Sequence, residues 1–294
     1  MRTLLRPAIA AGCALLAGCT YASQGESSDT GFQSREVAPD PAAQALLPAR
    51  IAESGRLIVG LDPSYAPAEF LGVDGVTPIG FDVDIAEAVG RVLGLDVVLE
   101  ASTFDAIIPG VGRRYDVGIS AFTIKPERLA AVTMVSYFQA GSLFAVRAGN
   151  PDGIDVANLC GATIGVQIGT LQQAELEELN RQCSDRPIRV LPYAEQATVT
   201  TNLVGGRLQA MYADSPVIGY AVERLGSTLE PLGEIRDAAP YGVVVARDDP
   251  QLAAATQAAL QVLMDRGVLE QIAAAWGVTG GALQRAEVWT AEGR

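Results

Sequence analysis

The chain has 294 residues, of which 49% are hydrophobic, and its 34 Asp+Glu outnumber its 21 Lys+Arg, which gives a formal charge of -13 at pH 7. It contains no histidine, and this excludes a Ser-His-Asp triad, a Cys-His dyad and a histidine-ligated zinc site. A chain this acidic has no broad basic face for phosphates, so nucleic acids and anionic lipid surfaces are poor partners.

Residues 1–18 have the layout of a secretory signal peptide. Arg2 and Arg6 precede an apolar run that ends in small residues, and this run is shorter than the roughly 20 residues of a membrane-spanning helix. Leu16-Ala17-Gly18-Cys19 then matches a bacterial lipobox, which predicts cleavage before Cys19 and a diacylglycerol on its thiol. An ordinary signal peptide followed by a chance cysteine is the alternative.

Residues 19–49 are predicted to be a flexible tether. They contain the run Ser-Gln-Gly-Glu-Ser-Ser-Asp-Thr-Gly and several prolines, and their apolar residues show no periodicity. Such a composition is typical of a linker. We therefore expect this segment to space the folded part of the protein from the membrane.

From Arg50 onward, short β runs alternate with helical stretches. The pattern predicts strands at 57–61, 97–99 and 117–119, with helical stretches at 81–93 and 104–111. This alternation is typical of an α/β fold with largely parallel strands.

The same alternation restarts in the second half of the chain, so two α/β units are expected. The predicted strands lie at 142–146, 163–166, 188–191, 210–213 and 241–246, and the predicted helices at 171–182, 198–205, 217–225, 252–264 and 268–276.

The expected export gives the four cysteines different roles. Cys13 would leave with the signal peptide and Cys19 would carry the lipid, so Cys160 and Cys183 remain as a pair. In an oxidising compartment such a pair is typically a disulfide. Two buried free thiols are the alternative.

Several short motifs then occur in the order and spacing of a known family. They are Leu57-Ile-Val-Gly-Leu-Asp-Pro-Ser-Tyr-Ala-Pro-Ala-Glu-Phe70, Gly80-Phe-Asp-Val-Asp84, Phe104-Asp-Ala-Ile-Ile-Pro109, Tyr115-Asp116, Thr123-Ile-Lys-Pro-Glu-Arg128, Gly165-Val-Gln-Ile-Gly-Thr170 and Ala213-Asp-Ser-Pro216. Over about residues 50–280 the chain therefore resembles the family-3 extracellular solute-binding proteins, which serve ABC importers of polar amino acids. With Cys160, Cys183 and Trp276-Gly277-Val278 it looks most like the lipoprotein members from actinobacteria.

This resemblance implies a two-lobed, periplasmic-binding-protein-like α/β fold of type II, with two crossover segments and a central ligand cleft. Lobe I would comprise residues 50–139 plus 242–285, and lobe II residues 143–238. The crossings would lie near Ala140-Gly141 and Ala239-Pro240, where Gly and Pro suit changes of chain direction.

A free α-amino acid is a zwitterion, so its site needs a cation for the carboxylate and an anion for the ammonium. The resemblance places Arg128 on the carboxylate, where a guanidinium can bind bidentately, with Ser120 and Thr123 as further donors. It places Thr170, at a helix start, on the same carboxylate and Asp214 on the ammonium. A solvated Arg128 and a helix-capping Asp214 are the alternatives.

The resemblance places Asp62, Tyr65, Phe104 and Gln167 around the ligand's side chain. The two aromatic residues can hold an aliphatic stem, an amide plane or a guanidinium between them, although both could instead be core residues. Asp62 favours a cationic or amide-bearing side chain, and Gln167 suits an amide. Ala121 departs from the Ser or Gly that many members have at this position.

The implied function is that of an exported, lipid-anchored binding protein on the outer face of the cytoplasmic membrane. It would be a monomer that captures a free polar L-amino acid, of the glutamine, asparagine, glutamate or basic type, by lobe closure. Its partner would be the transmembrane subunits of an ABC permease, and no cofactor, metal or nucleic acid is expected.

Two other functions use the same fold. One is an amino-acid-sensing receptor subunit, and the other, less favoured, is an enzyme similar to cyclohexadienyl dehydratase. An enzyme needs a general acid near the pocket. Glu69 is the carboxylate we nominate for that role, but we expect it to face solvent or to cap the turn at Pro67.

Overall fold

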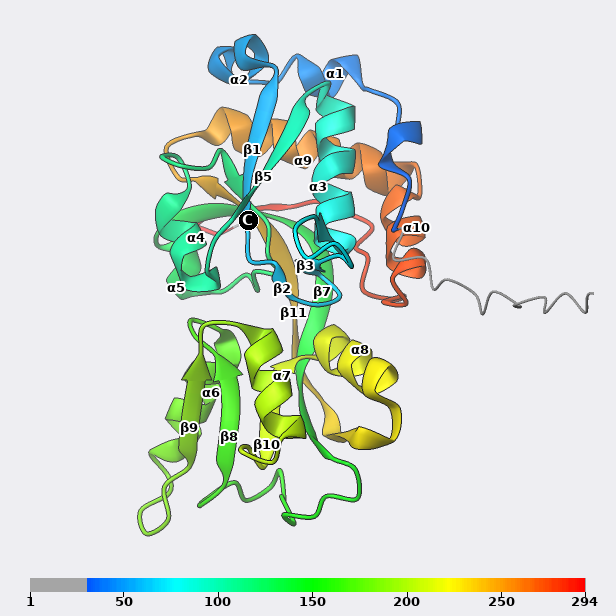
Figure 1. The fold of residues 1–294 in the computed structure, drawn as a ribbon. Helices are drawn as coiled ribbons and strands as arrows, with labels where there is room; N and C mark the ends of the chain where they lie inside the picture. Colours follow the sequence, from blue (N-terminus) through cyan, green and yellow to red (C-terminus); the bar gives the residue numbers. More distant parts are fainter. Residues whose placement is uncertain (1–30, 294) are drawn as a thin grey trace, which may run out of the picture.

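Two α/β lobes lie one above the other in residues 31–293, which are the residues that the computed structural model describes (Figure 1). The predicted signal peptide at 1–18 and the predicted lipidation site, Cys19, lie outside these residues. The type II two-lobed fold expected from the sequence is therefore present.

Lobe I is built on three parallel strands in the order β5-β1-β6. They are β1 (Arg56–Leu61), β5 (Asp96–Ala101) and β6 (Val117–Gly118). The helices of this lobe are α2 (Ala49–Ser54), α3 (Phe81–Leu93), α4 (Phe104–Gly110), α5 (Pro126–Leu129), α9 (Pro250–Asp265) and α10 (Val268–Ala275). The prediction of a helix at 81–93 is confirmed, because α3 ends at Gly94, whose φ of 68° closes the helix in a left-handed conformation.

A small antiparallel sheet of three strands, counted within the described residues, adjoins α3. It consists of β2 (Ser64–Tyr65), β3 (Glu69–Leu71) and β4 (Pro78–Ile79). These strands are too short to be predicted by periodicity. They matter because β2 and β3 carry side chains to the site between the lobes.

Lobe II has its own parallel strands and covering helices. The strands are β8 (Thr163–Gln167), β9 (Arg189–Tyr193) and β10 (Ala210–Asp214), and the helices are α6 (Leu171–Asn180), α7 (Gln196–Val204) and α8 (Ser215–Leu225), followed by the 3-10 turn η2 (Gly226–Thr228). Cys160 and Cys183 form the disulfide predicted from the sequence, with an S–S distance of 2.04 Å.

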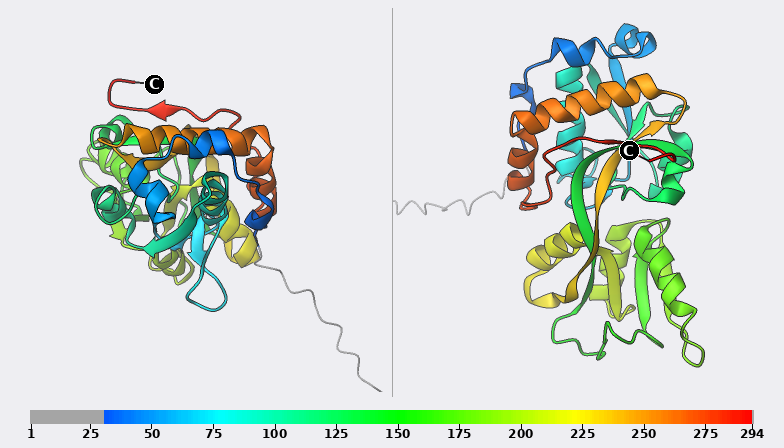
Figure 2. Two further views of the ribbon diagram at one scale, coloured as in Figure 1. Left: turned by 90° about the horizontal axis from the view of Figure 1, so that it is seen from above. Right: turned by 180° about the vertical axis from the view of Figure 1, so that it is seen from behind.

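Two long strands connect the lobes. Strands β7 (Val132–Arg147) and β11 (Leu229–Ala246) run antiparallel to each other through both lobes, as Figure 2 shows from behind. The described residues thereby form one nine-stranded sheet, in the order β5-β1-β6-β11-β7-β10-β8-β9 with β12 on β7. The predicted crossing points lie inside these strands, where Ala239 pairs with Ala140, so the chain crosses as irregular β structure rather than by sharp turns.

The prediction of a flexible tether is wrong for the C-terminal part of that segment, residues 32–47. Residues 32–47 contain η1 (Ser34–Glu36) and α1 (Pro41–Gln44), and the side chains of Val37, Ala43 and Leu47 are buried in lobe I. All three belong to the largest core cluster, and three buried apolar residues in so short a segment leave no periodic pattern to detect. At the other end, β12 (Val288–Trp289) pairs with β7 and extends lobe I past the predicted limit at 285.

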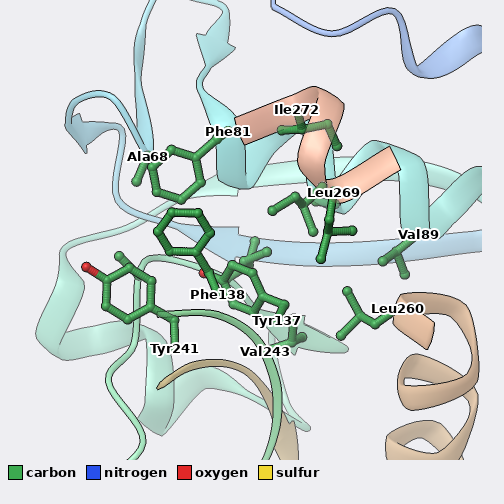
Figure 3. Packing of buried hydrophobic residues seen from close by; sticks show 14 of the residues in the cluster. Ala68, Phe81, Val89, Tyr137, Phe138, Tyr241, Val243, Leu260, Leu269 and Ile272 are labelled. Carbon is green, nitrogen blue, oxygen red and sulfur yellow. The ribbon is translucent and has the colours of Figure 1, made fainter. Parts of the chain in front are cut away.

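The largest core cluster packs the crossing strands against the helices of lobe I (Figure 3). Phe138 of β7 stacks between Phe81 of α3 and Tyr241 of β11, with ring centroids 5.0 Å and 5.8 Å apart. Leu269 and Ile272 of α10 close the cluster from the helical side. Because each buried side chain of this size stabilises the fold by about 1.5–3 kcal/mol, this cluster holds the crossing strands firmly to lobe I.

Candidate ligand site between the lobes

A small cavity of about 10 Å³ lies where the two lobes meet, scarcely room for one water molecule. Both lobes contribute to its wall, and the lining residues are Tyr65, Phe104, Ala121, Thr123, Arg128, Thr170, Leu171, Gln172 and Asp214. Most of the side chains predicted for the ligand are therefore brought together here. Ser120, Asp62 and Gln167 are not part of this wall.

Arg128 is a buried cation, 7% exposed. Its Nη1 donates to the carbonyl oxygen of Thr123 at 2.8 Å and its Nη2 to that of Gly169, in lobe II, at 3.3 Å. The guanidinium lies 5.2 Å and 5.3 Å from the ring centroids of Phe104 and Phe122, and it forms no ion pair within residues 31–293. Burial lowers the pKa of Arg128 to about 10, so it stays charged at neutral pH and is not the solvated first-turn residue of the alternative.

Asp214 is a buried acid on the facing lobe, 6% exposed. It follows β10, and its side chain makes no capping hydrogen bond to α8, which removes the capping alternative. Its Oδ2 accepts from the hydroxyl of Tyr65 at 2.9 Å and its Oδ1 from Nε2 of Gln172 at 2.7 Å. Burial raises the pKa of Asp214, and these two hydrogen bonds oppose that rise. No Lys or Arg among the described residues forms an ion pair with it.

Thr170 is the N-cap of α6. Its hydroxyl donates to the carbonyl oxygen of Gln167 at 2.7 Å and accepts from the backbone nitrogen of Gln173 at 3.3 Å. The hydroxyl is thus used for capping. What α6 offers to the cavity is the positive end of its dipole and the amides of its first turn.

Asp62 and Gln167 meet each other outside the small cavity. Nε2 of Gln167 donates to Oδ2 of Asp62 at 2.6 Å, and the same oxygen accepts from the backbone nitrogen of Phe104 at 3.1 Å. Burial raises the pKa of Asp62 to about 6. Since Phe104 lines the small cavity, the contact between Asp62 and Gln167 adjoins this cavity through Phe104.

Asp62 also lines a second, larger pocket of about 800 Å³ between the lobes. Its other lining residues include Phe70, Glu195, Gln196 and Tyr220. No donor among the described residues meets the buried Oε1 atoms of Gln167 and Gln196. Glu195 and Gln196 could not be found from the sequence, because they precede and begin α7, far from any quoted motif.

Ser120 points away from the cavity. Its hydroxyl donates to Oε1 of Glu69 at 2.5 Å and accepts from the backbone nitrogen of Asp62 at 3.2 Å. The expectation that Glu69 faces solvent or caps a turn is wrong, because its exposed fraction is 0%. Glu69 lies opposite the buried Tyr65 in the β2–β3 pair, and that pairing turns its side chain inward.

The described residues contain no group of three or more His, Cys, Asp or Glu arranged to hold a metal ion. None of the helices in this part of the chain is long and apolar enough to cross a bilayer. The site itself presents a buried guanidinium, Arg128, and a buried carboxyl group, Asp214, on walls that come from the two lobes.

The sequence of this chain is similar to those of bacterial solute-binding proteins. The model of the bacterial extracellular solute-binding proteins, family 3, matches residues 57–279. The arginine-binding protein ArgT of Corynebacterium glutamicum is 33% identical over 276 residues, which are 92% of this chain and 90% of that relative. The L-cystine-binding protein TcyJ of Escherichia coli K12 is 29% identical over 230 residues, covering 77% and 84% of the two chains.

Solved structures share the fold. A mutant of ArgBP from T. maritima has a TM-score of 0.72 at 28% identity and covers 80% of this chain and 99% of its own. An ancestral amino acid-binding protein, a precursor of cyclohexadienyl dehydratase, has a TM-score of 0.70 at 28% identity and covers 77% and 97%.

Proposed function

Because the chain belongs to the bacterial extracellular solute-binding proteins of family 3, we propose that it is the binding component of an ABC importer and that its ligand is a basic L-amino acid, L-arginine in first place. Amino acid binding is the activity common to its relatives. The transmembrane subunits of an ABC permease are its proposed partner, and the protein works as a monomer.

The observation that carries this proposal is the pair of opposite, buried charges on facing lobes. Arg128 and Asp214 are 7% and 6% exposed, and neither is ion-paired within the described residues. Keeping an unpaired charge buried is costly unless a partner arrives. An α-carboxylate on Arg128 and an α-ammonium on Asp214 would supply both partners at once.

A basic side chain fits the acceptors beyond the cavity. Asp62 and Glu195 contribute carboxylates to the larger pocket, and Gln196 contributes a buried carbonyl oxygen without a donor. A guanidinium carries five N–H donors in a rigid fork and no acceptor, so it matches this set better than an amide or a carboxylate does. The name of the Corynebacterium relative supports the same ligand.

Binding would require the lobes to separate and close again. A cavity of about 10 Å³ cannot hold an amino acid, and site residues now bond to each other across the lobes, as Tyr65 does to Asp214 and Gln167 to Asp62. A ligand that replaces these contacts with stronger charged ones favours the closed form by its differential affinity.

Export and a lipid anchor on Cys19 complete the proposal. The lipobox at Leu16-Ala17-Gly18-Cys19 supports it, and residues 20–30 would link the anchor to the packed segment at 32–47. The protein would then stand on the outer face of the cytoplasmic membrane, beside its permease.

The enzyme alternative has little support from the site. Glu69, the carboxylate nominated as a general acid, lies behind Ser120 and does not line the cavity. A general acid must come within hydrogen-bond reach of its substrate. A sensing role uses the same pocket, and permease and ATPase genes beside this gene would favour import.

A thermal-shift screen of the twenty amino acids, followed by calorimetry, tests the proposed function. A ligand at about 100 times its Kd should stabilise the protein by about 2.7 kcal/mol. L-Arginine should raise the Tm most, lysine less, and leucine not at all. The proposal fails if no amino acid raises the Tm, and its ligand class fails if leucine does so as strongly as arginine.

A further inference from the structure

A pair of buried acids lies directly behind the segment 120–123 of the ligand site. Glu69 comes from β3 and Asp82 from the first turn of α3, and the exposed fraction of each is 0%. Glu69 accepts from the hydroxyl of Ser120 at 2.5 Å, and Asp82 accepts through Oδ2 from the backbone nitrogen of Ala121 at 2.7 Å. Two consecutive residues of this segment are therefore each held by one member of the pair.

The backbone of Ala121 is strained, and the hydrogen bond to Asp82 stabilises it. Its φ is 49°, in the left-handed region that non-glycine residues adopt only at a cost, and it lines the small cavity beside Thr123 and Arg128. Asp82 is itself fixed, because its Oδ1 accepts from the hydroxyl of Tyr137 at 2.7 Å. A chain of contacts from the lobe I core thus sets the backbone at the cavity wall.

The two carboxyl groups also interact with each other through a hydrogen bond. Two ionised carboxylates have no hydrogen to donate, so a proton must lie between them. No N–H or O–H donor of another described residue meets the buried Oε2 of Glu69, so this atom is available to hold the proton.

The surroundings favour retention of that proton. The titratable groups that act on the pair are Tyr137 on β7, Asp62 at the end of β1, Asp214 on β10 and Tyr65 on β2, all acids or phenols. Burial raises the pKa of Asp82 to about 7 and the pKa of Glu69 well above its ordinary value. Loss of the shared proton at alkaline pH would leave two like charges in contact.

We propose that Asp82 and Glu69 are positioning residues of the ligand site, which hold Ser120 and Ala121 in place through a shared proton and so shape the wall that receives the ligand's α-carboxylate. This inference rests on the proposed function. Ser120 extends the effect to the other end of the site, because its hydroxyl also accepts from the backbone nitrogen of Asp62. Neither acid touches the ligand.

The test compares L-arginine binding by calorimetry in the full chain and in Asp82→Asn, with the Tm measured in parallel. The amide of Asn cannot accept from both Tyr137 and Ala121, so the affinity should fall by about tenfold to a hundredfold. Asp84→Asn is the matched control, because Asp84 is a buried acid on the same helix that bonds instead to Nε1 of Trp276 and to Phe32. It should leave the affinity within about threefold of the original.

A second substitution distinguishes a role of Asp82 in positioning the ligand site from a role in stability alone. Glycine adopts a positive φ without strain, so adding Ala121→Gly to Asp82→Asn should recover about half or more of the lost binding free energy while restoring the Tm only in part. Glu69→Gln keeps a donor toward Asp82 and an acceptor toward Ser120. We expect the original chain to bind more weakly at about pH 9 than near pH 7, and Glu69→Gln to bind at pH 7 like the original chain without that alkaline loss.

The outcomes are separable. Failure of the original chain to bind L-arginine overturns the proposed ligand, and the same variants are then titrated with the tightest-binding amino acid of the screen. Normal affinity in folded Asp82→Asn, or a Tm loss with no change in affinity, overturns the positioning role. An unchanged alkaline profile in Glu69→Gln overturns the shared proton.

Discussion

Nε2 of Gln167, in lobe II, donates to Oδ2 of Asp62, in lobe I, over 2.6 Å. The bond ties the lobes together beside the small cavity, and Asp62 also lines the larger pocket. A ligand side chain that reaches Oδ2 of Asp62 would replace the amide of Gln167 with a donor of its own. A cation replaces it at a gain, because a charged hydrogen bond is about twice as strong as a neutral one.

Asp62→Asn should separate basic from amide ligands. L-Arginine affinity should fall by about a hundredfold, because a charged contact in a buried site is lost, while L-glutamine affinity should change by less than about tenfold. Calorimetry with both ligands measures this. Glu195→Gln is the comparison at the exposed rim, where an effect below about fivefold is expected because solvent screens the charge. Equal losses for both ligands in Asp62→Asn would show that Asp62 does not read the side chain's charge.

Arg128→Ala should abolish amino acid binding while the chain stays folded. The buried guanidinium is the cation of the site, and truncating one partner of a desolvated charge pair typically costs about 2–5 kcal/mol. The control is Arg114→Ala, since Arg114 pairs with Glu100 on the surface. Calorimetry measures the affinity of each variant, and circular dichroism shows whether the variant is folded. A Kd raised by less than about tenfold would refute the role of Arg128.

Stability should fall as the pH rises from about 5 to about 8. Burial raises the pKa of Asp62 and of Asp84 to about 6 and that of Asp82 to about 7, so the native state binds more protons than the unfolded state in this window. The stabilisation is fully present below the unfolded-state pKa near 4 and is lost as the pH passes the native values. Denaturant unfolding at several pH values measures the slope.

The Asp84→Asn variant should show a shallower decline of unfolding free energy between those pH values, because it lacks one of these acids. Asp74 contributes in the opposite sense, since its pKa is lowered to about 2 by hydrogen bonds from Thr77 and Val76, but that effect lies below the window. A stability that rises from pH 5 to pH 8 would contradict the burial of these carboxyl groups.

Removing the disulfide should weaken lobe II without touching the site. The bond links residues separated by 23 positions, for which the chain-entropy model gives a stabilisation of about 3 kcal/mol. Guanidinium unfolding of a Cys160→Ala, Cys183→Ala double variant should show that loss, and arginine affinity should stay within about threefold. Alkylation of Cys160 without reductant in the exported protein would contradict the bond.

Cys19→Ala should release the protein from membranes, because a lipid chain can no longer be attached. Fractionation of expressing cells, with detection of the protein in membrane and soluble fractions, measures this. Cys13→Ala is the control, since that residue lies within the predicted signal peptide and its loss should leave the membrane fraction unchanged. Membrane retention of the Cys19→Ala chain would contradict the anchor.

The sequence by itself determined the repeated α/β alternation and most elements of both lobes. The helix at 81–93 was predictable to the residue because Gly80 and Gly94 flank an uninterrupted apolar pattern, and both signals are local. The Cys160–Cys183 bond followed from the small number of cysteines. The candidate residues that line the cavity, Arg128 and Asp214 among them, came from the resemblance of the ordered motifs to the family-3 binding proteins.

Tertiary structure alone decided which isolated side chains are buried and what they meet. The hydroxyl of Ser120 reaches Glu69 across 51 positions of sequence, and the amide of Gln167 reaches Asp62 across 105. Local periodicity carries no information about such encounters, because burial depends on distant segments that fold onto the residue. For the same reason the packing of residues 32–47, the continuous crossing strands and the acid pair Glu69–Asp82 could not be predicted from the chain itself.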